Sequence, residues 1–138
     1  MNSWALVFTT WLLATLATAG SLFFSEVMSY PPCALCWYQR IAMYPLVLIL
    51  LPAVLSFEKS VLKYSLPITV VGWLIAIYHN FVYFGIIPET LSPCTMGVSC
   101  KAQFFQLLGF VDIPQLSLFA FTLILMTLLY LRKVSAHE

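Results

Sequence analysis

The chain has 138 residues, of which 62% are hydrophobic and only 8% are charged. Because an ordinary soluble domain is about half apolar and roughly a quarter charged, this composition excludes a typical soluble domain and a disordered chain. Six basic and five acidic residues give a net charge of +1, so the sequence has no basic field for nucleic acid, which we do not expect as a partner.

Four long stretches of the sequence carry no charged residue. They contain 25, 17, 25 and 19 residues and occupy positions 1–25, 41–57, 64–88 and 113–131. A helix needs about 20 mostly apolar residues to cross a bilayer. The sequence therefore predicts an all-α integral membrane protein, a single four-transmembrane-helix bundle over residues 1–138. We predict its helices at about residues 4–24, 32–57, 64–86 and 113–131.

The first stretch has a second interpretation. It contains Ala17-Thr18-Ala19, a small-residue pattern typical of a signal-peptidase site. The three residues at its start include no Lys or Arg, although a signal peptide normally has a basic region before its apolar region. We therefore expect the stretch to remain as the first helix, and cleavage is the alternative.

The basic residues predict how the chain threads through the membrane. Lys59 and Lys63 lie between the second and third stretches, and Arg132 and Lys133 follow the fourth. Lys and Arg close to helix ends favour the cytoplasmic side. We therefore expect a multi-pass protein of the cell membrane with both termini in the cytoplasm. The first and third connections between helices then lie on the outer face.

The second outer loop contains a short amphipathic segment. In residues 101–108, Lys101, Gln103 and Gln106 are mixed with Phe and Leu, and Gly109 follows. This pattern predicts a short amphipathic helix that lies in the membrane interface and ends at the glycine.

All four cysteines fall in or beside the two outer loops. Cys33 and Cys36 form a C-x-x-C motif, and Cys94 and Cys100 form a second close pair. An even number of cysteines facing an oxidising compartment argues for disulfides, and four cysteines allow three pairings. Closeness in the chain favours Cys33–Cys36 with Cys94–Cys100, because short loops close at a low entropic cost.

The residues before the C-x-x-C motif favour a catalytic disulfide. Pro31 and Pro32 directly precede Cys33, and proline is favoured in the first turn of a helix. At a helix start, free backbone N–H groups and the helix dipole stabilise a thiolate and lower the cysteine pKa. A plain structural disulfide and a four-cysteine zinc site are the alternatives. Because an oxidising outer face argues against resident zinc, we expect no metal.

Two ionisable side chains lie close to this motif in the predicted bundle. Arg40 continues the helical stripe of Cys33 and Cys36, about one turn deeper. We predict that it stabilises the Cys36 thiolate and donates hydrogen bonds to a bound electron acceptor, and snorkelling to the headgroups is the alternative. His79 interrupts the third helix at a similar depth, and we consider it either a second residue of that site or a structural residue.

Residues 31–40, P-P-C-A-L-C-W-Y-Q-R at the head of the second of four helices, resemble the disulfide bond formation protein B (DsbB) family. The short chain and the close Cys94–Cys100 pair resemble the short BdbC-type Gram-positive branch of that family. The resemblance covers essentially the whole chain. Two departures are Gln39, where longer members often carry an acid, and the six-residue spacing of the second pair.

The resemblance implies a protein disulfide oxidoreductase that supports the folding of exported proteins. A reduced thioredoxin-fold thiol oxidase of the DsbA type would attack the loop pair outside the cytoplasm, at Cys94. The electrons would pass to the C-x-x-C pair and then, from Cys36, to a membrane quinone, with menaquinone favoured over ubiquinone. The implied catalytic residues are Cys33, Cys36, Cys94 and Cys100, and the implied quinone-binding residues are Arg40 and His79.

Three other classes of protein share some of these features. A soft-metal carrier would need cysteines at membrane depth or on both sides of the membrane, whereas these share one side. A structural membrane subunit would contain inert disulfides. A reductase of the vitamin K epoxide type is expected to place its C-x-x-C motif late in the bundle rather than at the second helix.

Overall fold

The computed structural model describes residues 2–56, 58–95, 97–101 and 109–137. Its long helices are α1 (Ser3–Leu22), α2 (Ala34–Leu55), α3 (Val61–Tyr83) and α4 (Ile113–His137). Each is long and apolar enough to cross a membrane, α1 together with the short π-helix η1 (Phe23–Val27) that continues it. The predicted four-helix membrane bundle is therefore confirmed. The interfacial helix expected in the second outer loop falls on residues 102–108, which lie outside the described residues.

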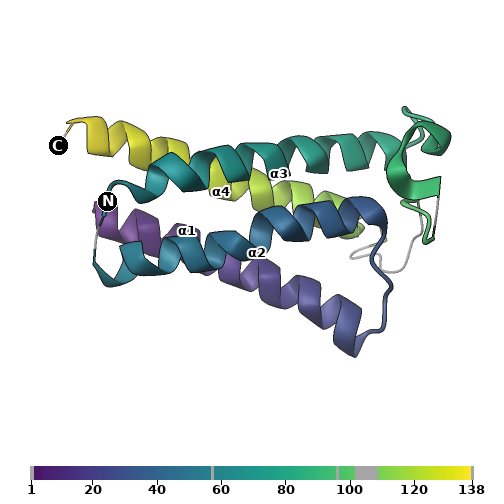
Figure 1. Cartoon of the computed structure of the whole chain (residues 1–138), viewed down its shortest axis with the longest axis horizontal. Helices are drawn as coiled ribbons and strands as arrows, with labels where there is room; N and C mark the ends of the chain where they lie inside the picture. Colours follow the sequence, from purple (N-terminus) through teal and green to yellow (C-terminus); the bar gives the residue numbers. More distant parts are fainter. Residues whose placement is uncertain (1, 57, 96, 102–108, 138) are drawn as a thin grey trace.

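The four helices form a closed ring in which each packs against two neighbours. Helix α1 contacts α2 and α4, and α3 contacts the same two helices. Figure 1 shows both chain termini at one end of the bundle, whereas the α1–α2 and α3–α4 connections lie at the opposite end. We call these the terminal end and the cysteine end, because both cysteine pairs lie at the latter.

Several helix ends differ from the expected positions. Helix α3 begins and ends three residues earlier than predicted, at Val61 and Tyr83. Helix α4 continues to His137, so Arg132 and Lys133 lie on the helix and do not follow it. Positive side chains near a helix C-terminus stabilise the helix through its dipole, which allows α4 to extend past the apolar run. Helix α2 begins at Ala34, after two prolines that precede its N-cap.

The main core of the bundle, here called the aliphatic core, contains buried apolar residues from all four helices, including Leu6, Leu46, Ala76 and Phe121. Helix α3 approaches its neighbours closely at Gly72. A Cβ atom there would overlap the Phe121 ring of α4 and meet the Ala42 Cβ of α2 at 3.0 Å. Small residues allow this kind of close packing between membrane helices.

Hydrogen bonds between helices supplement this core. The Thr10 hydroxyl of α1 donates to the Thr127 hydroxyl of α4 at 3.0 Å. The Trp73 indole N–H of α3 donates to the Thr122 hydroxyl of α4 at 3.0 Å. Such bonds satisfy polar groups that lipid could not satisfy.

Candidate redox site at the cysteine end

The start of α2 positions the C-x-x-C pair. Pro32 disfavours helical backbone at Pro31, so the chain enters α2 in an extended conformation. Cys33 is the N-cap, and its Sγ accepts a hydrogen bond from the Cys36 backbone N–H at 3.4 Å. A free N–H group of the first helical turn thus points at the sulfur, as the sequence predicted. The Sγ atoms of Cys33 and Cys36 lie 3.1 Å apart as free thiols.

The second pair lies in the α3–α4 connection. Cys94 and Cys100 form a disulfide with a Cα–Cα distance of 5.6 Å, and both side chains are buried. Gly97, between them, has a φ of +92°, a conformation that glycine adopts without strain. The short loop can therefore turn back on itself within the spacing of this pair.

Glu89 holds the far side of this loop. Its Oε1 accepts hydrogen bonds from the Ser99 hydroxyl at 2.5 Å and from the Cys100 backbone N–H at 2.8 Å. These bonds, the Ser99 bond first, lower the pKa of the Glu89 carboxyl, and the nearby Lys101 charge adds to the effect. The carboxylate therefore fixes the backbone position of Cys100.

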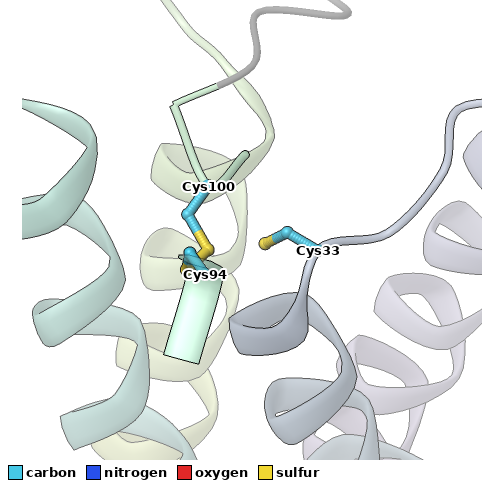
Figure 2. A group of neighbouring side chains, drawn as sticks. All are labelled: Cys33, Cys94 and Cys100. Carbon is cyan, nitrogen blue, oxygen red and sulfur yellow. A yellow bond between two sulfur atoms is a disulfide. The ribbon is translucent and has the colours of Figure 1, made fainter. Parts of the chain in front are cut away.

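The two pairs meet at Cys33. The Sγ atoms of Cys33, Cys94 and Cys100 all lie within 4.8 Å of one another. Figure 2 shows the Cys33 side chain reaching from the start of α2 toward the Cys94–Cys100 disulfide. Because thiol–disulfide exchange requires a thiolate to reach a disulfide sulfur, small movements suffice for exchange between the pairs. Together with Leu35 and Val82, these cysteines form the buried group that we call the cysteine cluster.

A histidine and an amide lie behind Cys33. The His79 Nε2 of α3 is 3.7 Å from the Cys33 Sγ, and the Gln39 Nε2 of α2 is 3.0 Å from the His79 Nδ1. Both side chains are buried. When the Gln39 amide donates to Nδ1, the ring proton is on Nε2 and faces the sulfur, where such a donor stabilises a thiolate. Gln39 was not among the residues predicted for the site, although an amide one turn beyond a C-x-x-C motif is a usable signal.

Arg40 is held by α1. Its Nε donates to the Ser21 Oγ at 3.0 Å and its Nη2 to the Ser21 carbonyl oxygen at 3.1 Å. The Tyr44 hydroxyl donates to the same Ser21 Oγ at 3.4 Å, and the Arg40 Cζ lies 5.2 Å from the centroid of the Trp37 ring. The guanidinium is half-buried against the bundle. Ser21 and Tyr44 were not among the residues predicted for the site.

A cavity of about 330 Å³ lies between α1, α2 and α4 beside these residues. This volume is at the lower end of the range for small-molecule sites, which are mostly apolar with a few polar groups. Apolar side chains such as Leu16, Met43 and Phe121 form most of its wall. The polar and reactive residues that line it include Cys33, Cys36, Gln39, Arg40, His79 and Cys100. The cavity therefore brings the predicted acceptor-site residues beside the C-x-x-C pair.

Four membrane-spanning helices, a helix-borne C-x-x-C pair and an adjacent loop disulfide define a membrane thiol–disulfide oxidoreductase. The family model described as "Disulfide bond formation protein DsbB" matches residues 2–131. The chain belongs to this DsbB family, as its resemblance indicated.

Known relatives match nearly the whole chain. It is 42% identical over 132 residues to a "Probable disulfide formation protein" of Metapseudomonas resinovorans, covering 95% of this chain and 92% of the relative. It is 41% identical to "Disulfide bond formation protein C" of Bacillus subtilis (strain 168), covering 95% of each. It is also 44% identical to a "Probable disulfide formation protein C 2" of Bacillus cereus, over 89% of this chain and 87% of the relative. No solved structure matches the chain significantly.

Family membership establishes the general activity. The chain is a multi-pass membrane disulfide oxidoreductase, and the predicted class of enzyme is confirmed. The family in general comprises quinone-dependent oxidases that act on a thiol oxidase partner.

Proposed function

We propose that this chain reoxidises an extracytoplasmic thioredoxin-fold thiol oxidase of the DsbA type and passes the electrons to a membrane quinone. It thereby supports disulfide formation and the folding of exported proteins. One observation carries this proposal: the Cys33 sulfur lies close both to its own partner Cys36 and to the Cys94–Cys100 disulfide. Its Sγ lies 3.1 Å from that of Cys36 and within 4.8 Å of those of Cys94 and Cys100.

The first step oxidises the partner. A thiolate of the reduced partner attacks Cys94, and a mixed disulfide forms as the Cys94–Cys100 bond breaks. The second partner thiolate then attacks the partner sulfur in that mixed disulfide. The partner leaves with its own disulfide, and Cys94 and Cys100 remain as thiols.

The second step moves the electrons to the C-x-x-C pair. The Cys100 thiolate attacks Cys33 in a Cys33–Cys36 disulfide, and Cys36 leaves as a thiolate. Cys94 then attacks Cys100, which restores the loop disulfide and releases Cys33. The end state has a Cys94–Cys100 disulfide and free Cys33 and Cys36 thiols, which is the arrangement of sulfur bonds in this structure.

The cavity beside Cys36 fits a quinone headgroup, since it is mostly apolar, has the volume of a small-molecule site and contains a charged donor. A bound quinone supplies an acceptor for two electrons and two protons. Arg40 carries five N–H donors and uses two of them in its bonds to Ser21, so others can bind a carbonyl oxygen. His79 lines the same cavity and can hold a proton beside Cys33. The resemblance to the Gram-positive branch favours menaquinone.

We propose that the cysteine end faces outward and both termini are cytoplasmic. Support comes from Lys59 and Lys63 in the α2–α3 region and from Arg132 and Lys133 on α4, which lie toward the terminal end. A reporter fused after the C-terminus should be active in the cytoplasm, and one inserted before Cys33 should be active outside. A C-terminal reporter that is active outside would contradict this orientation.

The whole cycle can be tested with the purified chain in lipid nanodiscs. Reduced thioredoxin-fold oxidase and a soluble menaquinone analogue are added, and quinone absorbance and partner thiols are followed together. We expect one quinol for each partner disulfide, and we expect no catalytic turnover in Cys100→Ser. Multiple turnovers without quinone, or full turnover in Cys100→Ser, would contradict the proposal.

A further inference from the structure

The reduced C-x-x-C pair and His79 form a set of ligand atoms suited to a soft metal ion. The two Sγ atoms and the His79 nitrogen all lie within 4.8 Å of one another. The Cys33 Sγ is 3.1 Å from the Cys36 Sγ and 3.7 Å from the His79 Nε2. In tetrahedral zinc sites, Zn–S bonds of about 2.3 Å and Zn–N bonds of about 2.0 Å place ligand atoms about 3.5–3.8 Å apart. Small thiol rotations would complete such a set.

We infer that the reduced protein binds one thiophilic divalent cation, of the Zn²⁺ or Cd²⁺ class, through Cys33, Cys36 and His79. Each thiol gives up its proton as a metal–sulfur bond replaces the S–H bond, and no electron is transferred. Two thiolates and a dication make a neutral cluster. Neutrality matters here, because a net charge is costly in a buried site and Arg40 already lines the same cavity.

Gln39 supplies the support that a ligating histidine normally has. Its amide lies 3.0 Å from the His79 Nδ1, and both side chains are buried. When Nε2 binds the ion, Nδ1 carries the ring proton and needs an acceptor. The Gln39 amide can rotate to present its carbonyl oxygen. An acceptor of this kind fixes the imidazole ring and makes it a better ligand.

The cavity provides access and a fourth ligand position. Cys33, Cys36 and His79 all line it, and Pro32 and Ser99 line it from the two connections at the cysteine end. A water molecule can take the remaining position, as in zinc sites that have three protein ligands. A cation can therefore reach the sulfurs from the cysteine end without crossing the bundle.

The oxidation state of the protein controls this site. A Cys33–Cys36 disulfide removes both sulfur ligands and leaves His79 alone, which is too little for tight binding. The ion thus binds only the reduced Cys33–Cys36 pair and prevents these two cysteines from forming their disulfide. This redox-dependent site differs from the resident four-cysteine zinc site that the sequence argued against. It also differs from a carrier, since its ligands occupy one end of the bundle.

Cadmium titration can test the site in the full-length chain. The variant Cys94→Ser/Cys100→Ser, in detergent and reduced with a phosphine, keeps only the C-x-x-C sulfurs. We expect one Cd²⁺ per chain, detected by sulfur-to-cadmium charge-transfer absorption, with affinity set by chelator competition. A further His79→Ala substitution in this double variant should weaken Cd²⁺ binding by about 10- to 100-fold. The control substitution His137→Ala, which changes the other histidine of the chain, should have no effect. Oxidation of the pair should abolish binding.

A second variant separates a lost ligand from a misfolded protein. Gln39→Glu puts a carboxylate beside Nδ1, a stronger acceptor for the ring proton, so Cd²⁺ binding should tighten several-fold. If the double cysteine variant binds Cd²⁺ equally well with and without His79→Ala, the two thiols alone chelate the ion and the proposed site is overturned. Unchanged affinity in Gln39→Glu, or no saturable binding, would overturn it as well. Because the readout is binding without turnover, this result is independent of the proposed relay.

Discussion

The aliphatic core and the cysteine cluster are built on different principles. The aliphatic core takes side chains from all four helices, and polar bonds such as Thr10–Thr127 link those helices directly. The cysteine cluster takes its residues from the start of α2, from α3 and from the α3–α4 connection. Its sulfurs are held by one disulfide and by local hydrogen bonds such as Glu89–Cys100.

This difference separates stability from chemistry. Because the aliphatic core holds the four helices together, we expect the disulfides of the cysteine cluster to break and reform without loss of the packing between helices. The reactive atoms still need accurate placement, and buried polar residues such as Gln39 and His79 provide it. Substitutions in the cluster should therefore reduce electron flow, whereas substitutions in the core should reduce stability.

The largest effect is expected at Cys33, whose sulfur lies between Cys36 and the Cys94–Cys100 disulfide. Cys33→Ser keeps the shape of the N-cap but removes the exchangeable sulfur, so turnover should fall by at least about 10³-fold. The partner should still be oxidised once by the loop disulfide, since that pair is intact. Rapid mixing with reduced partner, followed by thiol alkylation and mass spectrometry, measures both events. Sustained turnover in this variant would remove Cys33 from the relay.

A smaller effect on chemistry is expected at Arg40. Charge-assisted hydrogen bonds contribute about 1.5–3 kcal/mol, so Arg40→Ala should raise the apparent quinone KM by roughly 10- to 100-fold. Arg40→Lys should recover only part of this, because lysine lacks the planar fork that also binds Ser21. Steady-state kinetics with varied quinone provide the measurement. If Lys serves as well as Arg, the guanidinium acts only as a snorkelling charge.

A substitution at Gly72 tests the aliphatic core, and its expected effect is on the stability of the bundle. Gly72→Ala adds a Cβ that overlaps the Phe121 ring, and relieving such overpacking costs about 1–3 kcal/mol. Unfolding in mixed micelles should show the lower stability. Gly20→Ala is the matched control, since nothing lies within 4 Å of the added atom. Equal stability of the two variants would contradict the packing argument.

The sequence predicted those features that depend on local pattern. The charge-free stretches predicted the four helices, and the residues around Cys33 predicted the start of α2. The contact between Arg40 and Ser21 could not be predicted, because α1 is apolar on all sides and its rotation toward α2 leaves no trace in the sequence. The contact between His79 and Cys33 depends in the same way on the register between α2 and α3.

The smallest effect is expected at Glu89, which positions Cys100 from outside the cluster. Hydrogen bonds, chiefly from Ser99, hold its pKa below the ordinary value of 4.5. Its stabilising contribution is therefore fully present above pH 4.5 and is lost as the pH falls through the lowered pKa. Exchange between the loop thiols and Cys33–Cys36 should be roughly 2- to 5-fold faster in the parent than in Glu89→Gln at neutral pH, the size expected for a weak electrostatic contact near the surface.

The ratio of these two exchange rates should approach one as the solution is acidified below pH 4.5. Taking the ratio cancels the pH dependence of the thiolates themselves, which both proteins share. Glu26→Gln, which changes an exposed acid of η1 at the end of α1, serves as the control and should give a ratio near one at every pH. If the ratio of the parent rate to the Glu89→Gln rate does not change with pH, the loop is positioned without the carboxylate charge. In that case the disulfide and the turn at Gly97 alone would place Cys100 beside Cys33.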